Sequence, residues 1–208
     1  MTKKPTNRDL QAEERRKQLL QASKELFAKQ GFHATPIRSI NRSIGMADGL
    51  IYHYFPKGKQ QILETIVEDS FTSRSEILAQ QLSGLITKEV PLKQALIIFI
   101  ERMNEMVLSD QLSALIMFRE RAYLSDDFVE KLGVMIINRL DWLANFLNER
   151  HEAGEIEQLD FQIAAKQITS INFILIVKEM LGLNVILESK QEFIEKSVDQ
   201  LVKFWEKK

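Results

Sequence analysis

Apolar residues recur every three or four positions along almost the whole chain, which is the spacing of one face of an α-helix. In the first such segment, from about Asp9 to Gln30, Leu19, Ala22 and Leu26 form the apolar face, and Gly31 supplies a stop. No segment shows the alternation of apolar and polar residues between turn residues that predicts a strand. The pattern therefore predicts an all-α protein.

Glycine and proline divide this pattern into about nine helices. Two short helices follow the first one, and six longer helices follow them. The second helix is expected to open with the capping hydroxyl of Thr35 followed by Pro36, and to end at Gly45. The helices expected after it are about Ala47–Phe55, Lys59–Gly84, Pro91–Val107, Gln111–Tyr123, Ser125–Gly154, Asp160–Leu181 and Lys190–Lys207. We expect a small N-terminal domain over residues 1–60 and a larger helical domain over residues 61–208.

Composition narrows the class of protein further. At 208 residues the chain forms one or two domains, with 45% hydrophobic and 27% charged residues, as in ordinary globular proteins. The absence of cysteine excludes disulfides, thiolate nucleophiles and Cys-ligated metal sites. The longest apolar run, Ala95–Ile100, is far too short to span a membrane, and the charged N-terminus lacks the apolar core of a secretory signal. We expect a cytoplasmic protein.

The formal net charge of −1 hides an asymmetry between the two ends of the chain. Residues 1–60 carry 12 Lys and Arg against 5 Asp and Glu, a net charge of +7, and the remaining residues carry a net charge of −8. A basic head on an acidic body indicates that the head binds a polyanion. Scattered surface charge without a partner is the alternative, which charge alone leaves open.

The most informative segment is Thr35–Lys59, TPIRSINRSIGMADGLIYHYFPKGK. Two short helices joined by a glycine turn are typical of a helix-turn-helix, whose second helix enters the major groove of DNA. Basic and hydroxyl groups lie where phosphates would be, and such contacts give salt-dependent affinity. These phosphate candidates are Thr35, Arg38, Arg42, Tyr52, Lys57 and Lys59.

A set of residues at fixed spacings, most of them aromatic residues and glycines, runs through residues 14–63: Phe27, Gly31, Phe32, Thr35, Ile40, Gly45, Gly49, Tyr52, Tyr54, Phe55 and Lys59. With these residues the sequence resembles the TetR family of bacterial transcription repressors. The resemblance implies a three-helix DNA-binding head on a larger helical domain that binds a ligand and forms a dimer. The second half of the chain fits that family in size and layout only.

The resemblance also suggests individual roles in the head. It assigns Tyr52 to a phosphate and Tyr54 to the rim of the DNA interface, with a core aromatic as the alternative for each. Gly49 either lets the backbone approach DNA closely or only starts a helix. Asp48 either favours the helix N-terminus, which we prefer, or accepts from a cytosine amine. The predicted DNA-binding set also includes Leu50 and His53.

Three departures from the family pattern bear on the head. Ala47 stands where a hydroxyl usually caps the recognition helix. Asn41 and Ile44 stand where alanines are usual, which affects how the second and third helices pack. The turn before the fourth helix is one residue longer than the common form, so either Lys57 or Lys59 makes the expected phosphate contact.

The body has two predicted roles. The resemblance implies an effector pocket among helices five to eight, and soft or aromatic residues there suit a lipophilic small molecule, although plain core packing is an alternative for each. The pocket candidates are Met103, Met106, Met117, Phe118, Trp142, Phe146 and Phe173. A cavity near Trp142 distinguishes an effector-responsive regulator from a constitutive one with a filled core.

Dimerisation is the second role, because one recognition helix reads only a few base pairs and a symmetric site needs two heads about 34–36 Å apart. The last two helices are rich in apolar residues, and the resemblance implies a four-helix bundle made from two protomers. The interface candidates are Ile168, Ile171, Leu175, Leu201, Val202 and Trp205, with the core of one protomer as the alternative.

An enzyme is the remaining class. The sequence contains no glycine-rich phosphate loop, no Glu-x-x-His metal pair and no Ser/His/Asp arrangement, and its three histidines are scattered. We therefore expect no catalytic residues, no metal and no cofactor. The predicted partners are double-stranded DNA, a second copy of the chain and an unidentified small effector.

Overall fold

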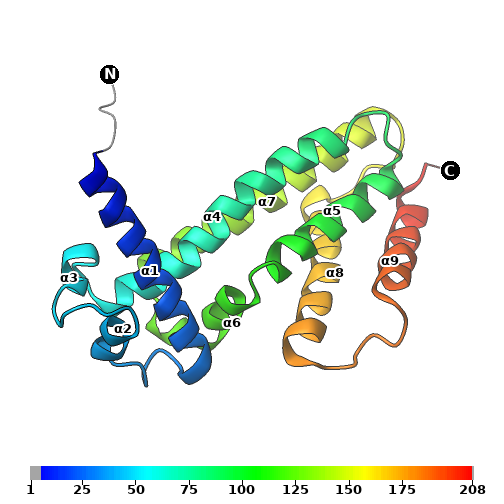
Figure 1. The fold of residues 1–208 in the computed structure, drawn as a ribbon. Helices are drawn as coiled ribbons and strands as arrows, with labels where there is room; N and C mark the ends of the chain where they lie inside the picture. Colours follow the sequence, from blue (N-terminus) through cyan, green and yellow to red (C-terminus); the bar gives the residue numbers. More distant parts are fainter. Residues whose placement is uncertain (1–5, 208) are drawn as a thin grey trace. The chain divides into compact units, whose positions relative to one another are not determined.

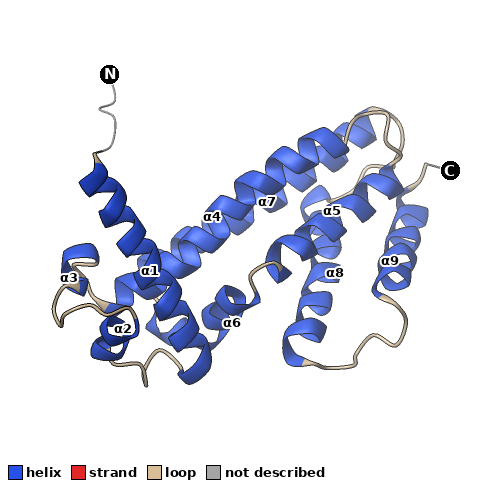
Figure 2. Ribbon diagram, in the orientation of Figure 1, coloured by secondary structure: helices blue, strands red, loops and turns tan. Residues whose placement is uncertain are grey.

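The computed structural model describes residues 6–207, and all of its regular structure there is helical, as predicted (Figures 1 and 2). Its only β-type pairing in this range is an isolated bridge between Ile156 and Glu206. The α-helices are α1 (Asn7–Gln30), α2 (Ile37–Ser43), α3 (Ile51–Tyr54), α4 (Lys59–Leu85), α5 (Leu92–Leu108), α6 (Gln111–Arg119), α7 (Asp126–Glu152), α8 (Phe161–Leu181) and α9 (Lys190–Trp205), and a 3₁₀ turn, η1, covers Arg121–Tyr123.

By packing, the chain divides into two compact units. The first unit comprises Met1–Thr72 and Asp110–Phe128, and the second comprises Ser73–Ser109 and Val129–Lys208. Helix α6 thus belongs with the N-terminal helices, because it packs along α1. The boundary after residue 60 separates the predicted DNA-binding domain from the predicted effector-binding and dimerisation domain, and it stays a prediction.

Helix ends follow local chemistry, and three of them differ clearly from the sequence predictions. The helix expected over Gln111–Tyr123 ends at Arg119, and a 3₁₀ turn covers Arg121–Tyr123. Thr6 and Asp9 form a reciprocal capping box at the start of α1, and Asp160 caps α8 through the backbone N–H of Ile163 at 3.0 Å. The prediction that the third helix begins at Ala47 is wrong, because Gly49 adopts φ +90° and a helix cannot continue through that conformation.

The start of α2 also differs from the sequence prediction. Pro36 is the N-cap residue, and no side chain caps this helix. The hydroxyl of Thr35 instead donates to the backbone carbonyl of Gly31 at 2.7 Å, so it stabilises the turn before the helix. The predicted capping role of Thr35 is therefore wrong.

Each unit has its own apolar core. In the first unit, Phe27, Ile40, Ile51 and Phe55 are completely buried and bring α1, α2 and α3 together. In the second unit, α5 packs against both α8 and α9, and its core includes the C-terminal parts of α4 and of α7. No helix in the described part of the chain is long and apolar enough to span a membrane.

Candidate nucleic-acid interface and effector cavity

The turn between α1 and α2 is held by side chains that arrive from far along the sequence. The ammonium of Lys59 donates to the carbonyl oxygens of Phe32 at 2.7 Å and Thr35 at 3.0 Å, and it lies 4.3 Å from the centre of the Phe32 ring. Burial lowers the pKa of Lys59, and Glu120 partly opposes this shift. Lys59 therefore orders the turn before α2.

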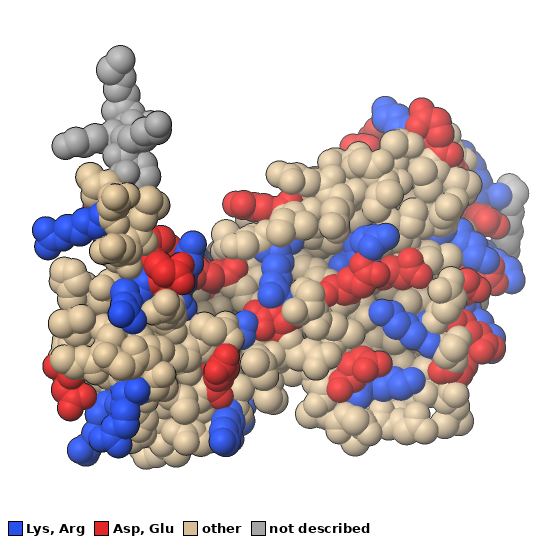
Figure 3. Space-filling model, in the orientation of Figure 1, with Lys and Arg blue, Asp and Glu red and all other residues tan. Residues whose placement is uncertain are grey.

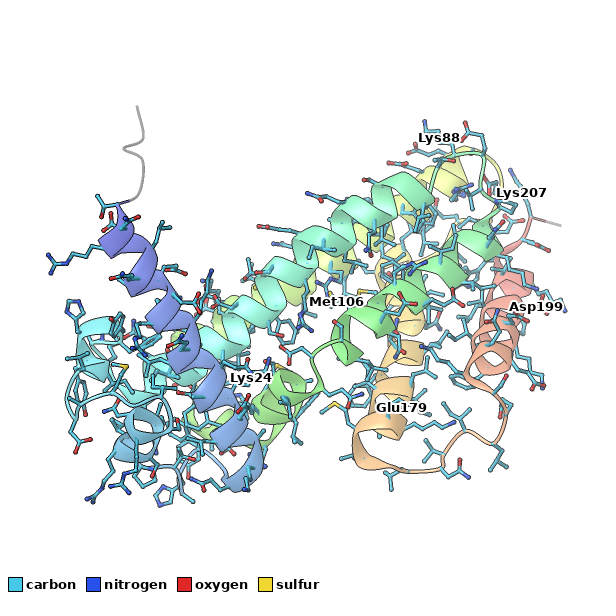
Figure 4. All side chains as sticks on the ribbon, in the orientation of Figure 1. Lys24, Lys88, Met106, Glu179, Asp199 and Lys207 are labelled. Carbon is cyan, nitrogen blue, oxygen red and sulfur yellow. The ribbon has the colours of Figure 1, made fainter. Side chains whose placement is uncertain are left out.

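The C-terminus of α1 is stabilised in a similar way from α6. Arg119 donates to the backbone carbonyls of Ala28, at 3.0 Å, and of Phe27, and it pairs with Glu120 at 2.7 Å. At the other end of α6, Asp110 accepts from Lys24 at 2.6 Å; Lys24 is labelled on α1 in Figure 4. These polar contacts fix α6 to α1 within the first unit.

Helix α2 buries one face and exposes the other. Ile40 and Asn41 are completely buried, while Arg38 and Arg42 are exposed. Neither polar atom of the Asn41 amide has a hydrogen-bond partner among the described residues. This is a cost in stability at the position where the sequence departs from the family pattern, and the exposed arginines are available to an anion.

Helix α3 is short and is anchored at both ends of its single turn. Ile51 and Phe55 are fully buried, and the guanidinium of Arg16 lies 5.2 Å from the centre of the Phe55 ring. The side chains between them, Tyr52 and His53, point to solvent, and Tyr52 is 51% exposed. The fold therefore holds polar aromatic groups outward on a rigid base.

Beside α3 lies a groove of about 540 Å³ that sequence reasoning missed. Its lining includes His53 and Tyr54 from α3 and Arg8 and Arg15 from α1. These two arginines add positive charge beside the predicted recognition helix. The basic N-terminal segment was visible in the sequence, but which face of α1 adjoins α3 depends on packing.

The predicted DNA-binding residues thus fall into two groups. Thr35 is buried, and Lys59 is used inside the unit, so neither offers its side chain freely to a phosphate. No side chain caps α3, so Asp48 does not act as a hydrogen-bonding cap. Except for half-buried Tyr54, the other predicted residues are exposed, namely Arg38, Arg42, Asp48, Gly49, Leu50, Tyr52, His53 and Lys57.

The second unit contains a cavity of about 360 Å³ between α4, α5 and α7. Its aromatic wall is built from Phe99 and Trp142, whose rings stack at 5.8 Å, and Phe146 stacks on Trp142 at 6.0 Å. A cavity beside Trp142 is the feature that distinguishes an effector-responsive regulator from one with a filled core.

Only Trp142 among the predicted pocket residues lines this cavity. Met117 and Phe118 belong to the first unit, and Phe173 is 59% exposed on α8, so these three do not form the pocket. Met106, labelled on α5 in Figure 4, lines a separate groove of about 200 Å³ with Arg74. Met103 is buried in the core of the second unit, and Phe146 packs against that core.

The predicted dimer residues lie mostly inside the protomer. Five of them, Ile168, Ile171, Leu175, Val202 and Trp205, are buried in the core of the second unit, and Leu201 packs against it. This corresponds to the alternative interpretation, in which these residues form the core of one protomer. Whether any of the six residues contacts a partner chain stays a prediction.

Neither surface charge nor metal ligands indicate a further site on the described part of the second unit. Lys and Arg alternate with Asp and Glu across the face of this unit that Figure 3 shows, so no patch of one sign stands out there. Among the described residues, no group of three or more His, Asp or Glu side chains is placed to bind a metal ion.

The comparisons with known proteins agree with this architecture. Residues 19–66 match the bacterial regulatory proteins of the tetR family. The chain is 26% identical over 152 residues to a fatty acid metabolism regulator protein of Bacillus subtilis, covering 73% of this chain and 76% of that protein. It is 42% identical over 55 residues to the transcriptional repressor KstR2 of Mycolicibacterium smegmatis, 26% of each chain.

Solved structures agree with the fold over most of the chain. The regulator FadR of Bacillus subtilis, crystallised with stearoyl-CoA, superposes with a TM-score of 0.67 at 21% identity, covering 89% of this chain and 97% of that one. Together with the helix-turn-helix at residues 35–55, the match over residues 19–66 supports a TetR family transcription regulator, and the solved structures show the same fold over most of the chain.

Proposed function

We propose that the chain is a ligand-responsive transcription repressor that binds a palindromic operator as a homodimer and is released by a small lipophilic effector. The observation that carries the DNA-binding part is the exposed face of α2 and α3. There, buried Ile51 and Phe55 hold Tyr52 and His53 outward on α3, and Arg42 is exposed on α2. Such a regulator acts in the cytoplasm, where the DNA is.

Contacts to phosphates and to bases have separate roles in this proposal. The basic side chains Arg38, Arg42 and Lys57, with Arg8 and Arg15 from α1, position the protein on the DNA backbone. Exposed side chains of the α3 region, Leu50, Tyr52 and His53, meet the major groove.

The homodimer in this proposal uses the exposed apolar residues of the last two helices. Phe173 and Leu181 on α8 are 59% and 63% exposed, and Phe204 on α9 is 76% exposed. Contiguous apolar patches are typical of protein interfaces, and we propose that these side chains form one. Leu201, half-buried on α9, lies one turn from Phe204 and extends the same face.

The cavity beside Trp142 supports an effector response over a constitutive regulator. A volume of about 360 Å³ with an aromatic wall lies within the usual range for small-molecule sites. The Bacillus subtilis relative that was crystallised with stearoyl-CoA supports a lipophilic ligand. An effector acts as a switch only if it binds one conformation of the protein better than the other.

Selection of bound duplexes from random DNA tests the proposal. We expect enrichment of a palindrome whose half-sites lie about one helical turn apart, and loss of that enrichment when a lipophilic ligand fills the cavity. The absence of any preferred duplex at moderate salt would overturn the proposal.

Sedimentation of charged variants tests the dimer. Phe173→Glu places a charge on the proposed interface, and we expect monomers with much weaker operator binding. Phe118→Glu is the matched control, because Phe118 is 54% exposed on α6 in the first unit. Dimers that persist in the Phe173 variant would show that the interface lies elsewhere.

A further inference from the structure

Arg139 is a half-buried cation of the second unit that lacks the carboxylate partner which buried Arg150 has. Arg139, on α7, is half-buried in the wall of the cavity, and its Nη2 donates to the hydroxyl of Ser75 on α4 at 2.6 Å. No carboxylate among the described residues pairs with it. A guanidinium carries five N–H donors, so most of its capacity is unused by this bond.

Arg150 in the same unit shows how a buried arginine can be compensated. Arg150 is 5% exposed, pairs with Glu155 at 2.8 Å and donates to the backbone carbonyls of Thr87 at 3.0 Å and Lys88 at 3.3 Å. Burial of a cation without such partners is costly. Burial lowers the pKa of Arg139, with no carboxylate to offset it.

The surroundings of Arg139 are mainly apolar. Leu78 and Leu82 from α4, Phe99 from α5 and Trp142 from α7 line the same cavity. An uncharged lipophilic ligand would fill this space and leave the guanidinium without an anion. A compact anion such as inorganic phosphate would pair with the guanidinium and leave the apolar wall uncovered.

We propose that the cavity binds an amphipathic anion, whose carboxylate pairs with Arg139 while its hydrocarbon chain lies along Phe99 and Trp142. A carboxylate accepts two parallel N–H bonds from a guanidinium, which selects for charge as well as for shape. This inference rests on the proposed effector response and specifies its ligand class. Arg139 is therefore the residue that distinguishes an acid from a neutral lipid of the same length.

Isothermal titration with matched probes tests this assignment. Dodecanoate and dodecanol share a chain length and differ in charge, and both are used below the concentration at which they aggregate. We expect the full-length protein to bind dodecanoate at least tenfold more tightly than dodecanol, a difference of about 1.4 kcal/mol. Lauroyl-CoA, whose charge lies on the nucleotide, shows whether the free acid or the thioester is preferred.

Variants separate a charge-reading role from a structural one. Arg139→Met keeps the length of the side chain, and we expect it to weaken dodecanoate binding at least tenfold and to leave dodecanol binding unchanged. Arg139→Lys should restore part of the preference for the acid. Arg102→Met is the matched control, because Arg102 pairs with Glu105 at 2.6 Å and does not line this cavity. We expect this variant to bind both probes as the unmodified protein does.

Thermal melting of the ligand-free variants gives a second readout. If Arg139 only tied α7 to α4, its replacement would lower the melting temperature, whereas an uncompensated cation predicts a melting temperature that is equal or higher. The proposal is overturned if Arg139→Met binds dodecanoate as tightly as the unmodified protein or loses both probes equally. Operator binding by the same samples without dodecanoate or dodecanol tests the proposed function separately.

Discussion

The two lysines on either side of Gly58 have different predicted roles, one in DNA binding and one in stability. Lys57 is exposed, whereas Lys59 donates to the carbonyls of Phe32 and Thr35 inside the first unit. Lys57→Ala should therefore weaken DNA binding through a lost phosphate contact. Lys59→Met, which keeps the aliphatic length, should destabilise the fold instead.

The magnitudes follow from the contacts. Each phosphate contact contributes about 0.9 to the slope of log K against log salt, so Lys57→Ala should flatten the slope by about 0.9. Lys59→Met removes two charge-assisted hydrogen bonds of 2.7 and 3.0 Å and a cation–π contact at 4.3 Å. Because Lys59 is half-buried, we expect a loss of about 2 kcal/mol in the free energy of unfolding.

Two assays separate these effects. Fluorescence anisotropy with a labelled duplex over a range of salt concentrations gives the slope, and circular dichroism at 222 nm gives the melting temperature. A slope flattened by Lys59→Met with no change in melting temperature would refute the assignment of Lys59 to the turn. An unchanged slope for Lys57→Ala would refute its phosphate contact.

Three further predictions concern the stability of the first unit. Asn41→Ala should raise the melting temperature by removing a buried amide without partners, a gain of about 1 kcal/mol, and a lower melting temperature would contradict this. Gly58→Ala should cost about 1–2 kcal/mol in a denaturant titration, because φ is +66° and a Cβ would lie 3.1 Å from the Tyr52 ring; an unchanged midpoint would count against it. The pKa of Asp110 is lowered because hydrogen bonds from Lys24 and Ser113 outweigh burial, which acts in the opposite direction. Its contribution is therefore present above the ordinary value of 3.8 and lost as pH falls through the lower folded value, and Asp110→Asn should flatten the loss of stability in acid.

The helices were predictable because their signals are local. Apolar spacing, Asp160 as a cap and prolines at helix starts fix most boundaries to within a few residues. The start of α3 was not predictable, because a glycine near a helix N-terminus is compatible with either helical or left-handed backbone. The observed φ of +90° at Gly49 places the start at Ile51.

The side-chain roles depend on contacts that spacing does not reveal. Lys59 lies 27 residues from Phe32, whose carbonyl it contacts, and nothing in the sequence pairs the two. Helix α8 is apolar on more than one face, so Ile171 and Phe173 have equal sequence claims to an interface. Packing against α5 buries Ile171 and leaves Phe173 exposed, which is why the proposed interface uses Phe173.

For the proposed function, we expect coupling between effector and operator to use the continuity of the chain. Helix α4 runs from the first unit into the second across Thr72, and α7 does so across Phe128. Arg139 and Ser75 join the second-unit parts of these helices, so a carboxylate that competes for the guanidinium acts on the bond between them.

Linkage makes this coupling measurable. If dodecanoate lowers operator affinity by a given factor, the operator must lower dodecanoate affinity by the same factor. We expect a factor of about 10, equivalent to about 1.4 kcal/mol, when each affinity is titrated with and without the other ligand. If dodecanoate binds and operator affinity stays unchanged, the cavity binds the acid without regulating DNA binding. A ligand with equal affinity for two conformations of a protein does not shift the equilibrium between them.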